Sequence, residues 1–168
     1  MKAVIQRVKS SSVKVDGEIV GKVDQGYLVL LGVMEGDTKA HAEMMANKTS
    51  ALRIFCDEDD KMNKSILDID GEILVVSQFT LCADVKKGNR PSFAASAAPD
   101  IANELYEYYM ECLKKNGVRK VEHGIFAAEM EVSIVNDGPV TILYDTDMKT
   151  SFIDRRIIDT VSVFYKSM

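Results

Sequence analysis

An uninterrupted apolar run, Tyr27–Val33 (YLVLLGV), constrains the fold more than any other stretch of this sequence. A run of this length without alternation predicts a fully buried strand. Three strand-like runs precede it, at Met1–Val8, Ser12–Val15 and Glu18–Val23, and the turn signals Asp16-Gly17 and Gln25-Gly26 separate the last of them from its neighbours. Such dipeptides between strands are typical of hairpins, so the N-terminal part is expected to form antiparallel strands.

Two helices are predicted after these strands. The first begins at Asp37, a favourable N-cap residue, and runs to about Arg53. Its core-facing positions fall on one side and are Ala42, Met45, Ala46, Thr49 and Leu52. The second helix opens at Pro99 and Asp100, and Gly117 stops it. Its apolar stripe has helical spacing and consists of Ile101, Leu105, Tyr108, Tyr109 and Cys112.

Further strands are predicted in the second half of the chain. They are Ile73–Leu81, a short strand near Val118–Val121, and a hairpin in which Val132–Val135 and Val140–Leu143 flank the turn signal Asn136-Asp137-Gly138. The fold class is therefore α+β: a mostly antiparallel sheet, curved or closed into a β-barrel, with two main helices. The pattern leaves open whether the helices share one face of the sheet.

The composition is that of one ordinary globular domain, which we assign to residues 1–148. The chain has 168 residues, of which 46% are hydrophobic and 28% are charged. No apolar run approaches the length of a membrane span. The first residues, Met1 to Arg7, become polar too early for a signal peptide. A cytoplasmic protein without membrane association is expected.

The net charge of −5 argues against a protein that grips long stretches of nucleic-acid backbone. It is compatible with contact to a short end of a nucleic acid. Basic residues gather at Lys86, Lys87 and Arg90. Taken alone, they are interpreted as solvated surface.

Sequence motifs for metal, nucleotide or triad chemistry are not found. The cysteines, Cys56, Cys82 and Cys112, form no C-x-x-C pair, and buried free thiols are expected. The two histidines, His41 and His123, belong to no His/Cys cluster and no H-E-x-x-H motif, and no phosphate-binding glycine loop occurs. A Ser/His/Asp triad would need one histidine to reach a nucleophile. His41 is interpreted as solvated on its helix, and the role of His123 stays open.

Two polar segments follow the second apolar strand. Ser77-Gln78-Phe79-Thr80 continues this strand, and alternation places Ser77 and Phe79 on one face of it. One interpretation is a strand that leaves the core for solvent. The other is a strand end that offers hydroxyls and backbone N–H groups to a substrate carbonyl. The next segment, Lys86 to Phe93 (KKGNRPSF), is either an anion-contacting loop or a plain loop.

The Gly138-Pro139 pair is the least expected feature of the final hairpin. Proline lacks the N–H donor of a sheet ladder and is confined to strand starts, edges and bulges. The residues alone favour a trans peptide bond at a plain hairpin.

Three motifs carry a family resemblance: SQFTL at 77–81, GNRPSF at 88–93 and NDGPVTI at 136–142. In this order they resemble the D-aminoacyl-tRNA deacylases, and AVIQRV at 3–8 and GYLVLLGV at 26–33 are similar too. The resemblance covers about residues 1–147. It ends near Asp147, so residues 149–168 form a C-terminal extension to which we assign no role.

The resemblance implies a cytoplasmic homodimer that hydrolyses the ester between a D-amino acid and the terminal adenosine of tRNA. Glycine misattached to alanine tRNA is an implied second substrate. The residues implied to line the active site are Ser77, Gln78, Phe79 and Thr80. Gly138-Pro139 is implied to have a cis peptide bond, to enter the active site of the partner subunit and to exclude L-residues. Neither a metal nor another cofactor is implied.

Several roles follow if this resemblance holds. Backbone N–H groups around Phe79 and Thr80 would stabilise the developing oxyanion. The Thr80 hydroxyl would act as nucleophile or position water, or the ribose 2′-hydroxyl of the substrate would assist, and the sequence leaves these routes open. Lys86, Lys87 and Arg90 become candidate phosphate contacts, and Arg7 is expected to brace the site.

Two other functions remain open because a fold does not determine function. The first is a non-catalytic module on the same fold that binds RNA or chromatin. The second is a Ser/Thr hydrolase of other small esters.

Overall fold

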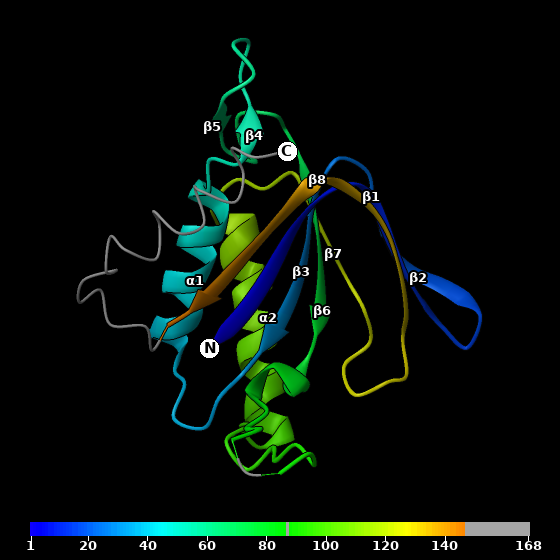
Figure 1. Cartoon of the computed structure of the whole chain (residues 1–168), viewed down its shortest axis with the longest axis vertical. Coiled ribbons are helices and arrows are strands. Elements are labelled where there is room, and N and C mark those ends of the chain that lie inside the picture. The colour runs from blue at the N-terminus through cyan, green and yellow to red at the C-terminus, as the bar shows by residue number, and fades with distance from the viewer. Residues whose placement is uncertain (87, 147–168) are drawn as a thin grey trace.

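The computed structural model of the chain describes residues 1–86 and 88–146, and Figure 1 shows its elements. The main sheet contains β1 (Lys2–Val15), β2 (Glu18–Val23), β3 (Gly26–Gly32), β6 (Glu72–Ser77), β7 (Lys120–His123) and β8 (Glu131–Asp145). A small hairpin pairs β4 (Phe55–Cys56) with β5 (Met62–Lys64). The helices are α1 (Lys39–Ala51) and α2 (Pro99–Lys115), and η1 (Phe79–Cys82) is a 3₁₀ helix. The predicted C-terminal extension lies outside the described residues.

The main sheet is curved and of mixed direction. Its order is β2-β1-β3-β6-β7, and β8 also pairs with β1. β1 is antiparallel to β2, β3 and β8, whereas β6 runs parallel to β3 and to β7. Lys120 Nζ on β7 donates to the carbonyl of Lys22 on β2 at 2.8 Å, which brings the two ends of this order together. The predicted barrel-like α+β fold with two helices is confirmed, although its sheet is less antiparallel than expected.

The two parallel pairs arise from connections that contain a helix. Between β3 and β6 the chain forms α1 and the β4–β5 hairpin, and between β6 and β7 it forms α2. Connections of this kind cross the sheet and return the next strand in the same direction. Both helices cover the same face of the sheet, because Met45 of α1 and Tyr109 of α2 pack into one cluster with Val29 (Figure 1).

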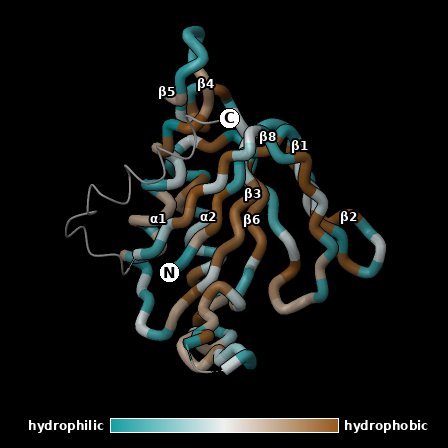
Figure 2. The backbone as a smooth tube through the Cα atoms, viewed as in Figure 1, coloured by the Kyte–Doolittle hydropathy of each residue, from teal (hydrophilic) through white to brown (hydrophobic). Residues whose placement is uncertain are grey.

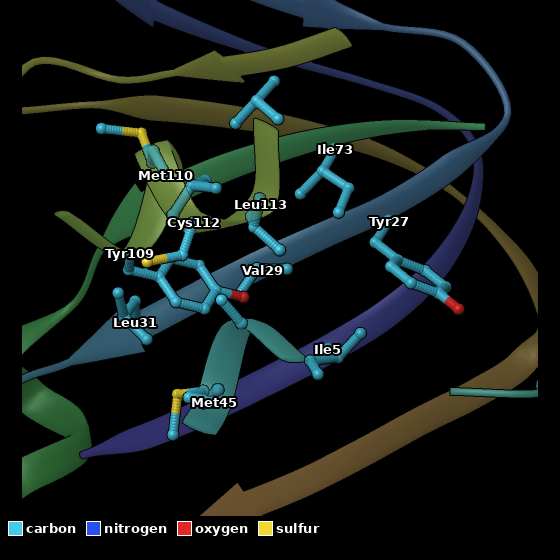
Figure 3. Close-up of a cluster of buried hydrophobic side chains, with 14 of the residues drawn as sticks. Ile5, Tyr27, Val29, Leu31, Met45, Ile73, Tyr109, Met110, Cys112 and Leu113 are labelled. Carbon is cyan, nitrogen blue, oxygen red and sulfur yellow. The ribbon is translucent and has the colours of Figure 1, made fainter. Parts of the chain in front are cut away.

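The described residues form two hydrophobic cores on opposite faces of the sheet. In the larger one, Figure 3 shows Met45, Tyr109 and Leu113 from the helices against Ile5 and Val29 from the strands. The smaller one fills the inside of the curved sheet and consists of Val8, Val13, Val23, Leu28, Leu74 and Val76. β3 lies between them and is buried along nearly its whole length, as predicted. Figure 2 shows the hydrophobic character of β3 and β6 in the middle of the molecule.

The predicted C-terminal hairpin is wrong: this region is one long strand with a bulge. β8 runs from Glu131 to Asp145 and is antiparallel to β1 along both halves. Val8 pairs with Asn136 and Gln6 pairs with Thr141, so Arg7 stands opposite the four residues 137–140. The turn residues bulge instead of reversing the chain, because the long β1 offers partners on both sides of them.

The helix ends agree with prediction except at the start of α1. Its N-cap residue is Thr38 rather than Asp37, and His41 completes a capping box with Thr38. Asp37 is occupied elsewhere, since its carboxylate accepts the backbone N–H of Met34 at 2.6 Å. α2 begins at Pro99 and ends shortly before Gly117, as predicted.

The cysteine prediction is correct for two of three residues. All three thiols are free, and Cys82 and Cys112 are buried. Cys56 is exposed because it lies on the small β4–β5 hairpin, which projects from the domain (Figure 1). Within residues 1–86 and 88–146, no helix combines the length and apolar character needed to cross a membrane.

Candidate functional site

The Ser77–Thr80 segment lies where the chain leaves the sheet. β6 ends at Ser77, which pairs with Leu31 near the end of β3, and the N–H of Gln78 donates to the carbonyl of Leu31 at 2.8 Å. The chain then turns into η1. The expectation that alternation continues through Phe79 is therefore wrong. Phe79 and Thr80 are exposed, and Ser77 and Gln78 are partly buried.

This turn leaves two backbone N–H groups without an acceptor in the 3₁₀ helix. The first bond of η1 joins the N–H of Leu81 to the carbonyl of Gln78 at 3.2 Å. The N–H groups of Phe79 and Thr80 precede it and have no acceptor within the 3₁₀ helix. Gln78 Nε2 donates to Thr80 Oγ1 at 2.6 Å and so fixes the hydroxyl beside them. Two N–H donors and one hydroxyl can therefore meet a substrate oxygen here.

An apolar cavity of about 540 Å³ adjoins this segment. Ser77, Gln78 and Phe79 contribute to its wall, whereas Thr80 does not. The remaining walls come from the end of β3, the start of α2 and the region after β7, and they include Leu31, Val33, Ala97, Ala102, Tyr106, Phe126, Met130 and Val132. Sequence reasoning missed these residues, because only the pairing of β3 with β6 and the packing of α2 on the sheet bring them together.

Tyr106 forms part of the cavity wall and is locked in place. Its hydroxyl donates to the carbonyl of Val75 at 2.8 Å. Burial raises the pKa of this phenol well above its ordinary value. Tyr106 is therefore a neutral structural group rather than an acid or a base near neutral pH.

The basic loop after η1 is closed by backbone hydrogen bonds. The N–H of Asp84 donates to the carbonyl of Ser92 at 2.8 Å, and the N–H of Ser92 donates to the carbonyl of Asp84 at 2.9 Å. Lys86 and Arg90 are exposed in the excursion between these residues. Lys87, the third predicted phosphate contact, lies outside the described residues.

Gly138-Pro139 projects from the bulge of β8. Both residues are exposed, and the peptide bond between them is cis. Gly138 has a φ of +146°, and a Cβ at this position would lie 2.4 Å from the backbone nitrogen of Val140. Only glycine fits this backbone without a rearrangement.

Arg7 holds the bulge from behind. Its Nε donates to the carbonyl of Asp137 at 3.0 Å and lies 3.2 Å from the Asp137 carboxylate. Its Nη1 donates to the carbonyl of Ile54 at 2.5 Å. Arg7 is only 8% exposed, and its guanidinium contacts Asp137 next to Gly138-Pro139 rather than Ser77–Thr80.

The two predicted parts of the site lie at opposite ends of the sheet within one chain. Arg7, which stands opposite the bulge, pairs with Tyr27 at the start of β3, whereas Ser77 pairs with Leu31. Four strand positions separate Tyr27 from Leu31, which corresponds to about 13 Å along the strand. Figure 1 shows the bend of β8 and the 3₁₀ helix after β6 at opposite ends. One chain does not bring them together.

The two histidines have structural partners. His41 Nδ1 accepts the backbone N–H of Thr38 at 3.2 Å, and His123 Nδ1 lies 2.7 Å from the carbonyl of Gly124. Neither is bonded to Ser77 or Thr80 among the described residues, so neither forms a triad with these hydroxyls. The described part of the chain also contains no group of three or more His, Cys, Asp or Glu side chains placed to hold a metal.

Solved structures share this fold. One described as "c-Myc DNA Unwinding Element Binding Protein" superposes with a TM-score of 0.82 at 44% identity and covers 86% of this chain and 98% of that one. Another, described as "Structural Analysis of a probable eukaryotic D-amino acid tRNA deacylase", has a TM-score of 0.74 over the same shares of the two chains. Its identity of 17% makes it evidence for the fold alone.

Similar sequences cover nearly the same region. Proteins named D-aminoacyl-tRNA deacylase from Thermosipho africanus and Syntrophomonas wolfei are 56% and 52% identical. The first match covers 87% of this chain and 97% of the relative, and the second covers 88% and 98%. The family model described as D-Tyr-tRNA(Tyr) deacylase matches residues 4–145. The chain therefore belongs to the D-Tyr-tRNA(Tyr) deacylase family, as its three motifs predicted.

Proposed function

We propose that this protein hydrolyses the ester between a D-amino acid and the terminal adenosine of tRNA, and the same bond in glycine misattached to alanine tRNA. Family membership supports the reaction class. The structural observation that carries the proposal is the pair of N–H groups at Phe79 and Thr80 beside an apolar cavity. We place the activity in the cytoplasm, where charged tRNA is used.

The two N–H groups suit the stabilisation of an oxyanion. Attack on the ester carbonyl moves charge onto its oxygen, and fixed donors lower the energy of that state. The carbon–oxygen bond to the ribose then breaks, and the ribose oxygen leaves with a proton. Removal of one such donor typically costs on the order of a hundredfold or more in rate. Because an aminoacyl ester is already reactive, these two N–H donors supply much of the rate enhancement needed.

Thr80 has a supporting role in this scheme. Its oxygen accepts a hydrogen bond from the Gln78 amide, which withdraws electron density from a nucleophile and fixes its position. We therefore assign the attack to water or to a route assisted by the ribose 2′-hydroxyl. Thr80→Ala is expected to retain measurable turnover. Loss of all turnover with preserved tRNA binding would identify Thr80 as the nucleophile instead.

The cavity suits the constant part of the substrate. The side chains of D-amino acids vary in size, whereas the terminal adenosine is the same in every tRNA. A walled apolar cavity of about 540 Å³ matches a flat base better than a variable side chain. This arrangement leaves the amino acid at Ser77–Thr80, outside the cavity.

A second copy of the chain completes the site in this proposal. Gly138-Pro139 is exposed and lies far from Ser77–Thr80 of its own chain. β8 also exposes apolar side chains, since Ile134, Val135 and Leu143 are 40%, 53% and 72% accessible. Several exposed apolar side chains on one strand favour a protein–protein contact along it. A homodimer would bury them and carry each bulge to the active site of its partner.

The bulge would select substrates by exclusion. Carbonyls held rigidly beside the Cα of the substrate accommodate the hydrogen of a D-residue and collide with the side chain of an L-residue. Glycine has no side chain and passes. Arg7 keeps this backbone in place through Asp137.

The first test is the hydrolysis of D-Tyr-tRNA and L-Tyr-tRNA with equal enzyme and excess chelator. We expect cleavage of the D form alone, and loss of selectivity or of activity in Gly138→Ala/Pro139→Ala. D-Tyr esters of small alcohols serve as the control for a general esterase. Turnover of these esters as fast as of charged tRNA would favour the small-ester hydrolase. Cleavage of neither tRNA would favour a nucleic-acid-binding module, a role suggested by the name of the 44% identical DNA-unwinding-element-binding protein.

Mixing two variants tests the shared site. Gly138→Ala/Pro139→Ala keeps its own Ser77–Thr80, and Thr80→Pro keeps the bulge but loses one N–H donor. A mixed dimer then contains one intact site made from both chains. D-selective hydrolysis should return after mixing, and its absence in dimers of proven mixed composition would place the whole site in one chain.

A further inference from the structure

Two exposed phenylalanine rings touch each other beside the candidate site. Phe79 is 59% and Phe93 is 37% exposed, and their centroids lie 5.0 Å apart in an edge-to-face arrangement. Every other phenylalanine and tyrosine in the described part of the chain is buried or partly buried. Exposed apolar side chains that lie together mark a binding surface, whereas single exposed apolar side chains are ordinary.

The backbone holds both rings in place. Phe79 belongs to η1, and its carbonyl accepts the hydroxyl of Ser96 at 3.5 Å. The N–H of Ser96 donates to the carbonyl of Phe93 at 3.0 Å and closes a turn. Two backbone hydrogen bonds tie this turn to the chain after β3. The N–H of Glu35 donates to the carbonyl of Ala95 at 2.9 Å, and the N–H of Ala97 donates to the carbonyl of Val33 at 3.0 Å. The ring pair is thus a preformed feature of the fold.

We propose that this ring pair stacks on the nucleobase that precedes the terminal adenosine of the substrate tRNA, an inference that rests on the proposed function. Phe79 lines the cavity assigned to the terminal adenosine, and Phe93 does not. The pair therefore continues the site outward from the cavity. Unpaired nucleotides are commonly bound by stacking on aromatic side chains, and the 3′ end of tRNA is unpaired.

Charge at this edge fits the same occupant. The loop closed by Asp84 and Ser92 comes directly before Phe93 and exposes Lys86 and Arg90. The Asp84 carboxylate accepts the backbone N–H of Lys86 at 2.8 Å. In a chain of net charge −5, two exposed cations next to an aromatic pair favour a nucleotide and its phosphate over a purely apolar partner.

Comparison of two substrates tests the proposal. D-tyrosyl-tRNA contains the preceding nucleotide, and D-tyrosyl-adenosine lacks it. Phe93→Leu keeps an apolar side chain but removes the flat ring, so kcat/KM for D-tyrosyl-tRNA should fall about tenfold, chiefly through KM. The value for D-tyrosyl-adenosine should not change. Phe93→Tyr restores a ring and should lie within about twofold of the original protein.

Ile19→Ala is the matched control, since Ile19 is 55% exposed on β2 and its loss should change neither value. Equal losses on both substrates in Phe93→Leu, or no loss on D-tyrosyl-tRNA, would overturn the stacking role while the hydrolase stands. A Phe93→Leu protein that falls to the mass of one chain in gel filtration would assign the rings to a contact between copies. Hydrolysis of neither substrate by the original protein would refute the proposed function and the stacking role together.

Discussion

Arg7 is a charged side chain that the fold buries against backbone carbonyls. Its guanidinium joins β1 to Asp137 in the bulge of β8 and to Ile54 beside the β4–β5 hairpin. Guanidinium donors have fixed directions, and a lysine ammonium cannot reproduce two of them at once. We therefore propose that Arg7 is a positioning residue whose effect on substrate passes through Gly138-Pro139.

Arg7→Lys tests this role because it retains the charge but loses the fixed directions. Loss of one such bond weakens the brace by about 1–3 kcal/mol. We expect the ratio of D-Tyr-tRNA to L-Tyr-tRNA hydrolysis to fall about tenfold. Lys9→Gln, an exposed change on the same strand, is the control. An unchanged ratio in Arg7→Lys would mean that the bulge keeps its shape without the guanidinium.

At the scale of single residues, the sequence motifs predicted which residues form the candidate site better than they predicted the direction and contacts of the side chains. Ser77, Gln78 and Thr80 stood out as polar residues after an apolar run, and they do lie together at a strand end. The direction of Phe79 could not be predicted, because the alternation rule fails once the chain enters a 3₁₀ helix. The side chain of Phe93 gave no signal of its own, since its partner ring approaches through tertiary contacts.

Glu72, at the start of β6, connects this strand to the turn between β2 and β3 and to the start of β7. Its carboxylate accepts the N–H of Asp24 at 2.9 Å and lies 2.9 Å from Arg119 and 3.4 Å from Lys120. Burial raises the pKa of Glu72, but the Asp24 N–H and the two cations outweigh it and hold the pKa below its ordinary value of 4.5. The charged form is thus stabilised in the folded protein.

The sign of this pKa change gives a pH dependence. A lowered pKa contributes stability that is complete above the unfolded value and is lost as the pH falls through the folded one. Glu72→Gln should lower the free energy of unfolding by about 1 kcal/mol at pH 7, and the difference should shrink below about pH 4. Urea unfolding at several pH values measures this. Glu18→Gln, on the exposed start of β2, is the control, and a constant difference for Glu72→Gln at all pH values would contradict the ion-pair explanation.

At the scale of secondary structure, the helices and strands were predicted better than the pairing of the strands. The helices and the buried strand β3 follow from local pattern, and the structure confirms them. A hairpin and a bulged strand share the same alternation around the same turn residues, so only the partner strand distinguishes them. The parallel pairs could have been inferred from the helices that separate the strands, because a helical connection returns the chain in the same direction.

At the scale of the whole molecule, charge limits how much of a tRNA the protein can hold. The net charge is −5, and the exposed cations described near Ser77–Thr80 are Lys86 and Arg90. Contact with two or three phosphates of a single strand gives a slope of about −2 in log K against log salt concentration. Binding of D-Tyr-tRNA at several salt concentrations measures this slope. Lys86→Gln/Arg90→Gln should make it shallower, and a wild-type slope steeper than about −4 would indicate a larger footprint.

The position of β8 has a consequence for motion. Among the described strands β8 pairs with β1 alone, whereas β3 and β6 each have neighbours on both sides. Deuterium should therefore replace the amide hydrogens of β3 and β6 only when the whole domain opens, and those of β8 through smaller local openings. The segment assigned to substrate selection is thus carried by a strand that has a neighbour on one side alone. Its order would then depend on a second copy packed against it. Dilution below the dissociation constant of the dimer would speed hydrogen exchange in β8 first.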